Sequence, residues 1–94
     1  MYWIYEYIYK ISRGLSMCFY ARDDKTVEAM VRLYQEGTSD IKGLFCKFKK
    51  KRKVYIDEPP YEFEQSQIKI LKKGIERKNT LAKESSRYEL VNEK

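Results

Sequence analysis

Basic residues are concentrated in one short stretch of the chain, residues 41–56, which contains no acidic residue. Seven of the 20 Lys and Arg residues lie there, which leaves 13 against 14 Asp and Glu elsewhere, so the formal net charge of +6 is a local patch. Such a patch attracts polyanions through summed Coulomb attraction and the release of condensed counterions. The expected phosphate-binding residues are Lys47, Lys49, Lys50, Lys51, Arg52 and Lys53, with Lys72, Lys73, Arg77 and Lys78 extending the patch.

Residues 49–54, with the sequence Lys-Lys-Lys-Arg-Lys-Val, resemble the monopartite nuclear-import signal of polyomavirus large T antigens. The resemblance covers six residues and implies nuclear import if the host is eukaryotic. Basic runs of this kind also bind nucleic acid or acidic membrane lipids, and many are simply solvated turns. Because the run adjoins expected secondary structure, a freely accessible import peptide is the less favoured interpretation.

Aromatic residues form the second pattern. The chain has nine Tyr and one Trp, and Trp3, Tyr5, Tyr7 and Tyr9 alternate near its beginning. Alternate residues of a strand share one face, and aromatic side chains on a sheet stack on unpaired bases or form protein interfaces. Packing beneath helices is the plain alternative. We therefore predict that these four residues are base-stacking or interface residues.

The residue types argue against an enzyme. The chain contains no His, which excludes His-dependent nucleophilic triads and His-based metal sites and leaves only carboxylate metal sites. Asp57 with Glu76-Arg77-Lys78 resembles the Asp…Glu-x-Lys motif of metal-dependent nucleases, but that motif needs its Glu-x-Lys on a strand, and here it falls in an expected helix. We predict a non-enzymatic protein with no catalytic residue, no metal and no cofactor.

Length and composition indicate a single small domain. The chain has 94 residues, of which 43% are hydrophobic, which favours folding over disorder. No uncharged apolar run of about 18 residues and no secretory leader are visible, so we expect a soluble cytoplasmic protein. Cys18 and Cys46 lie among apolar residues and are expected to be buried free thiols. The bias toward Lys, Ile, Tyr and Glu is typical of AT-rich genomes, so we expect a viral or mobile-element origin.

The first half of the chain predicts two strands and a helix. Residues 2–11 are rich in aromatic and β-branched types, which favours a strand, although Ile4, Ile8 and Ile11 also follow helical spacing. Residues 12–14 read as a turn into an antiparallel strand over 15–21. Residues 25–37 predict a helix capped by Asp23 or Asp24, with an apolar face formed by Val27, Met30, Val31 and Tyr34.

The second half of the chain allows two alternative assignments before a long helix. Residues 39–53 match either a second helix or a hairpin of strands 44–48 and 54–57 whose turn contains the basic cluster, and we favour the hairpin. Pro59 and Pro60 interrupt the chain before a long helix over 61–83. The acidic residues Asp57, Glu58, Glu62 and Glu64 predict a solvated face, and residues 85–94 predict a short edge strand or a frayed tail.

These elements predict an α+β fold in the order ββαββα. An antiparallel sheet would have helices on one face, residues 1–84 would form the domain, and residues 85–94 would form a polar tail. We predict a small basic protein that binds nucleic acid with little sequence preference, or a regulatory protein of that kind. The alternative is a protein–protein interaction module, or a homodimeric inhibitor of a host factor, that acts through the Tyr/Trp-rich strand or the long helix. In either case we expect a homodimer, formed sheet against sheet or edge to edge through the first strand.

Overall fold

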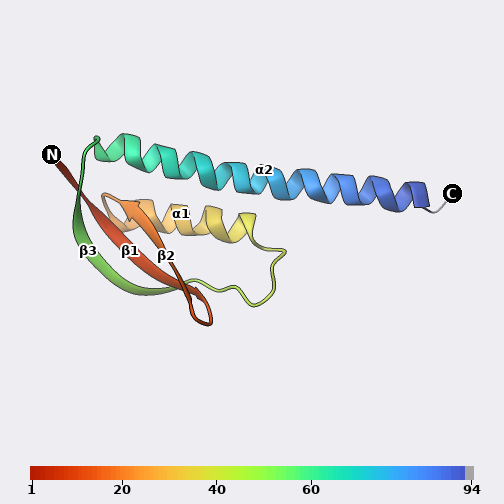
Figure 1. The fold of residues 1–94 in the computed structure, drawn as a ribbon, viewed down its shortest axis with the longest axis horizontal. Coiled ribbons are helices and arrows are strands. Elements are labelled where there is room, and N and C mark those ends of the chain that lie inside the picture. The colour runs from red at the N-terminus through yellow and green to blue at the C-terminus, as the bar shows by residue number, and fades with distance from the viewer. Residues whose placement is uncertain (93–94) are drawn as a thin grey trace.

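The computed structural model describes the backbone of residues 1–92 and the side chains of residues 1–81. Within them, the chain forms a small α+β domain with elements in the order ββαβα (Figure 1). Its elements are β1 (Tyr2–Ser12), β2 (Leu15–Ala21), α1 (Asp24–Gly37), β3 (Lys47–Ile56) and α2 (Pro60–Asn92). The α+β class and the long C-terminal helix are confirmed. The ββαββα order is wrong, because a single strand stands where we predicted the second hairpin.

β1 lies at the centre of an antiparallel sheet with the strand order β2-β1-β3. The predicted β1–β2 hairpin is confirmed, and its turn contains Gly14 with a φ of 78°, a conformation that glycine adopts at little cost. The register sets Tyr7 opposite Phe19 on one side and opposite Lys51 on the other. Because both sides of β1 are paired, the edge-to-edge dimer through the first strand is wrong.

α1 covers the face of the sheet that carries the odd-numbered residues of β1. The helix begins as predicted, since the Asp23 side chain accepts a hydrogen bond of 2.8 Å from the backbone N–H of Thr26. Its apolar face packs on the aromatic face of the sheet. The buried cluster consists of Tyr7, Phe19, Ala21, Val27, Met30 and Val31.

α2 runs along the outer edge of β2. The Gln67 side-chain amide accepts a hydrogen bond of 2.9 Å from the Tyr20 backbone N–H and donates one of 2.8 Å to the Tyr20 carbonyl. The Phe63 ring lies 5.3 Å from the Tyr20 ring on one face of the sheet, while Ile68 and Leu71 reach the buried cluster on the other. The helix therefore covers an edge of the sheet, so our prediction of helices on one face describes α1 only.

Two close contacts fix α2 in place. Glu64 is 1% exposed and accepts hydrogen bonds from the Arg22 backbone N–H at 2.6 Å and from the Arg22 Nε at 2.9 Å. The predicted solvated acidic face is therefore wrong for Glu64. Farther along, Gly37 at the end of α1 packs against Ile75 of α2, where an added Cβ atom would lie 3.4 Å from Ile75.

The basic stretch forms one continuous strand, β3, and the predicted hairpin is wrong. A tight hairpin turn needs residues with φ above zero, which Gly, Asn and Asp supply, and residues 47–56 contain none of them. The positive φ of 83° falls instead at Gly43, in the loop before the strand. The edge of a sheet also suits lysines, because they keep their charges in water there.

α2 extends to Asn92, past the predicted end at residue 83, and projects beyond the rest of the molecule (Figure 1). Residues 85–92, which we predicted to be an edge strand or a frayed tail, are therefore helical. Residues 93 and 94 of that predicted tail lie outside the described residues.

Candidate nucleic-acid interface

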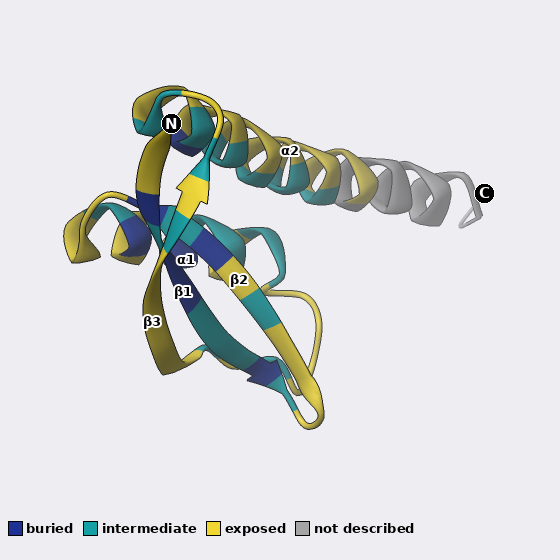
Figure 2. Ribbon diagram, turned by 60° about the vertical axis from the view of Figure 1, so that its left-hand side comes forward, coloured by how far each residue is buried: buried dark blue, intermediate teal, exposed yellow. Residues whose placement is uncertain are grey.

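β3 brings the six predicted basic residues of the 47–53 stretch onto one exposed edge strand. It pairs with β1 on one side only, and no other described strand borders it. Figure 2 shows β3 largely exposed beside the more buried β1. Because side chains alternate along a strand, Lys51 and Lys53 share the face covered by α1, whereas Lys50 and Arg52 point to the opposite face.

A β-bulge interrupts this alternation. Ile8 lies opposite Lys50, but Tyr9 lies opposite Phe48, so Lys49 is the extra residue. The bulge turns Phe48 toward Tyr9, with 5.7 Å between the ring centroids. It also adds a lysine to the exposed edge that no residue of β1 faces.

Lys51 makes contacts with side chains of the same chain. Its ammonium lies 3.0 Å from the Asp24 carboxylate and 4.2 Å from the centroid of the Tyr5 ring, a cation–π contact. The same Asp24 oxygen accepts a hydrogen bond of 2.8 Å from the Tyr7 hydroxyl. The Tyr7 hydroxyl and the Lys51 ammonium together lower the pKa of Asp24 below its ordinary value. Lys51 therefore joins β3 to α1 and is poorly placed to bind phosphate.

Arg52 is also paired, on the opposite face. Its Nε donates a hydrogen bond of 2.6 Å to Glu6, which is 6% exposed and accepts a second bond of 2.8 Å from the Tyr20 hydroxyl. The Arg52 guanidinium, helped by the Tyr20 hydroxyl, holds the pKa of the Glu6 carboxyl below its ordinary value despite the opposing effect of burial. Burial and the bond to Glu6 raise the pKa of Tyr20 to about 12. This cluster fastens all three strands together across the sheet.

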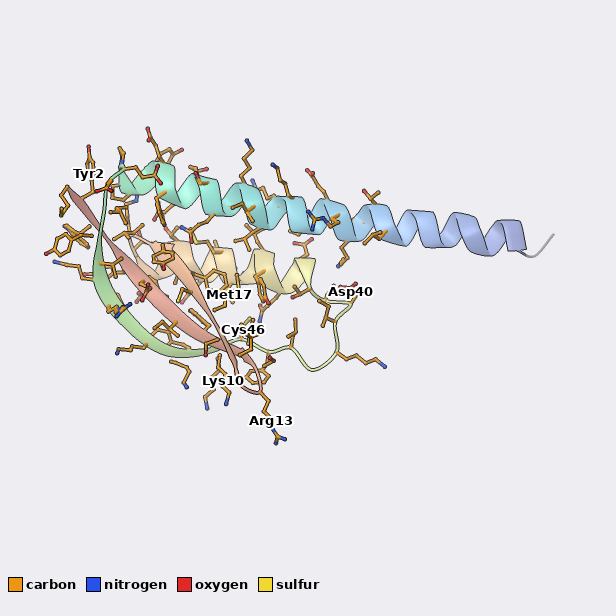
Figure 3. All side chains as sticks on the ribbon, in the orientation of Figure 1. Tyr2, Lys10, Arg13, Met17, Asp40 and Cys46 are labelled. Atoms are coloured by element: carbon orange, nitrogen blue, oxygen red, sulfur yellow. The ribbon has the colours of Figure 1, made fainter. Side chains whose placement is uncertain are left out.

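Four lysines of β3 remain without a carboxylate partner among the described side chains: Lys47, Lys49, Lys50 and Lys53. Lys47 lies directly opposite Lys10 of β1, and like charges in that position destabilise a sheet. Lys10 points away from the helices, as does Arg13 in the nearby turn (Figure 3). Sequence reasoning missed Lys10, because only the pairing of β1 with β3 brings it to the basic stretch.

The predicted aromatic residues differ in exposure. Tyr7 is 2% exposed and belongs to the core, and Tyr5 and Tyr9 are half-buried against it, so none of these rings presents an open face. Trp3 is 44% exposed. Tyr55 lies opposite Trp3 on β3 and is 68% exposed. Sequence reasoning missed Tyr55, because only the pairing of β1 with β3 brings it beside Trp3.

The predicted basic residues of α2 do not join β3. Lys72, Lys73, Arg77 and Lys78 lie on the helix that covers the β2 edge, with β1 between that edge and β3. The Lys78 ammonium donates hydrogen bonds of 2.8 Å to the Glu36 carbonyl and 2.5 Å to the Ser39 hydroxyl, at the end of α1. The structure therefore separates these residues from the β3 lysines.

The residues considered for other chemistry lie apart. Asp57 follows β3, whereas Glu76 lies on α2. The Glu-x-Lys is therefore on a helix and not on a strand, as the nuclease motif would require. Residues 1–81 contain no group of three or more His, Cys, Asp or Glu side chains that would hold a metal ion. Cys18 is exposed, which corrects our prediction of a buried thiol, and Cys46 is half-buried. Partial burial raises the pKa of both thiols.

Comparison with known protein families, curated proteins and solved structures finds no match to this chain. Neither described helix is long and apolar enough to cross a membrane.

Proposed function

We propose that the protein is a small non-enzymatic nucleic-acid-binding protein that contacts phosphates along the exposed edge of β3. The observation that carries this proposal is the set of four lysines, Lys47, Lys49, Lys50 and Lys53, which project from one edge strand with no described carboxylate partner. Lysine ammonium groups bind phosphate oxygens as point charges and carry no base-specific geometry. Binding with little sequence preference follows from that chemistry.

The plain alternative is that lysines on β3 only prevent edge-to-edge aggregation, as charged residues commonly do. Lys47 of β3 also lies directly opposite Lys10, which places like charges next to each other at the cost of stability. A bound polyanion would relieve this repulsion, so the arrangement favours a phosphate-binding surface.

A binding measurement with matched variants tests the proposal. We expect the Lys49→Ala/Lys50→Ala/Lys53→Ala variant to bind a labelled 20-nucleotide DNA at least about tenfold more weakly at 50 mM salt. The control is Lys69→Ala/Lys72→Ala/Lys73→Ala, which removes the same charge from exposed positions of α2. Equal weakening by both variants would show that net charge and not β3 determines the affinity.

We propose self-association through α2 as a second candidate function. Ile70 and Leu81 are 68% and 56% exposed on the helix, which projects beyond the domain (Figure 1). Exposed apolar residues on such a helix favour a protein contact. Pairing through β3 is disfavoured, because two copies would align their lysines. Light scattering of the Ile70→Lys/Leu81→Lys variant against the natural chain tests this; an unchanged mass would contradict it.

A further inference from the structure

Exposed aromatic residues border the lysines of β3 on the face toward α1. Tyr55 lies opposite Trp3 near one end of the strand, and these side chains are 68% and 44% exposed. Phe48, which is 50% exposed, reaches the same face at the other end because of the bulge. Lys51 and Lys53 lie between them. The face therefore reads aromatic, lysine, lysine, aromatic over about 20 Å of strand.

We infer that this face binds single-stranded nucleic acid, with bases stacked on Trp3 and Tyr55 and on Phe48. The inference rests on the proposed function and adds the kind of nucleic acid. Aromatic side chains need an open base face, which a paired and stacked duplex does not offer. The span suits a short segment, near the lower end of the roughly 4 to 16 nucleotides that single-strand-binding domains occupy.

Charge complementarity identifies the partner as a polyanion. The Lys53 ammonium lies 4.3 Å from the centroid of the Trp3 ring, and the bulge residue Lys49 projects from the same exposed edge, whereas Lys50 points to the opposite face. A base stacked on Tyr55 or Trp3 would thus have the Lys53 ammonium within reach of its own phosphate backbone. An acidic peptide would satisfy the lysines but would not use the flat aromatic surfaces.

Lys53 covers part of the Trp3 ring in the unbound protein. A cation–π contact at an exposed site is worth about a two- to fivefold factor in an equilibrium constant, whereas stacking one base is worth about five- to 150-fold. A base therefore displaces the ammonium, which then pairs with a phosphate of the same strand. Lys51 is less available to a phosphate than Lys53, because its ammonium already pairs with Asp24 at 3.0 Å.

Trp3 is the only tryptophan in the chain, so its fluorescence reports directly on stacking. The natural chain is titrated with a 12-nucleotide oligothymidylate, with a 12-nucleotide abasic strand that has the same phosphates, and with a 12-base-pair duplex. We expect oligothymidylate to quench Trp3 and to bind at least about fivefold more tightly than the abasic strand. The duplex should bind without comparable quenching.

Two tyrosine variants sharpen the test. Tyr55→Ser should weaken oligothymidylate binding by about fivefold or more while leaving the abasic strand unaffected. Tyr2→Ser is the matched control, because Tyr2 is 45% exposed beside Trp3 but on the opposite face of β1. The two variants should leave the circular dichroism spectrum unchanged.

The outcomes separate this inference from the proposed function. Equal affinity for oligothymidylate and the abasic strand, with unchanged Trp3 fluorescence, would overturn base stacking and leave phosphate binding intact. Tighter binding of the duplex than of oligothymidylate would also overturn the inference. No binding of any of the three at 50 mM salt would overturn the proposed function itself.

Discussion

The Lys51 ammonium lies 3.0 Å from the Asp24 carboxylate, which links the middle of β3 to the first turn of α1. The same oxygen accepts the Tyr7 hydroxyl bond from the central strand. One carboxylate therefore fixes a helix and two strands together. This contact divides a run of basic residues that look equivalent in the sequence into some that stabilise the fold and some that remain available to a ligand.

Lys51 and Lys49 should therefore behave in opposite ways when each is replaced by Ala. Lys51→Ala should lower the thermal midpoint, because it removes the ion pair and the cation–π contact, and should change DNA affinity less than Lys49→Ala does. Lys49→Ala should weaken DNA binding with little change in the midpoint, since Lys49 is the exposed bulge residue. Thermal unfolding and fluorescence anisotropy on both variants check this, and identical effects of the two would contradict it.

The Glu6–Arg52 pair should make stability depend on pH. The folded-state pKa of Glu6 lies below its ordinary value of 4.5, so the stabilisation from the ion pair is complete above pH 4.5 and is lost as pH falls through the lower folded value. The difference in unfolding free energy between the natural chain and Glu6→Gln should be constant from about pH 5 to 7 and should shrink below that. The difference in unfolding free energy for Arg52→Gln should follow the same pH profile. Lys49→Gln should show no such pH dependence. Urea unfolding at a series of pH values checks this, and a difference that grows on acidification would refute it.

Lys10→Glu should stabilise the free protein while weakening its binding to DNA. The change turns the repulsive Lys10–Lys47 pair into an attractive one, which is worth about 0.2–1 kcal/mol. Arg13→Glu is the control, since it makes the same charge change in the nearby turn without facing Lys47. Urea unfolding and anisotropy at low salt measure both effects. If Lys10→Glu destabilised the fold, Lys10 would have a structural role that this arrangement does not predict.

Gln67 should be essential for docking α2 against β2. Its side chain satisfies both free backbone groups of Tyr20, and Gln67→Ala leaves a donor and an acceptor of the edge strand without a partner. We expect a loss of about 1–3 kcal/mol in the free energy of unfolding and faster hydrogen exchange of the Tyr20 amide. The exposed Gln65→Ala provides the control. Equal stability of the two variants would argue against the edge-covering role.

Local patterns predicted the elements whose contacts are local. The spacing of Val27, Met30 and Val31 and the cap at Asp23 identify α1, because a helix is specified by neighbours in sequence. Gly14 likewise marks the β1–β2 turn. The long helix after Pro60 was also predictable, although its length was not.

The features that the sequence did not predict depend on contacts between residues far apart in the chain. β3 pairs with residues 37 to 54 positions earlier, from Lys10 opposite Lys47 to Tyr2 opposite Ile56, so neither its continuity as one strand nor the burial of Glu6 beneath Arg52 is visible in a local window. The alternation of the tyrosines correctly placed them on one face, but only the packing of α1 shows that Tyr7 lies inside. Tyr55 is a candidate base-stacking residue only because the pairing of β3 with β1 sets it opposite Trp3.

The salt dependence of DNA binding tests the central claim most directly. If the four unpaired lysines of β3 neutralise about four phosphates of a single-stranded 20-mer, the logarithm of the association constant should fall against the logarithm of the salt concentration with a slope of about −3. The Lys49→Ala/Lys50→Ala/Lys53→Ala variant should reduce the slope to about −1 between roughly 50 and 200 mM salt. An affinity that does not change over this range, or a slope that the three substitutions leave unaltered, would contradict phosphate binding by β3.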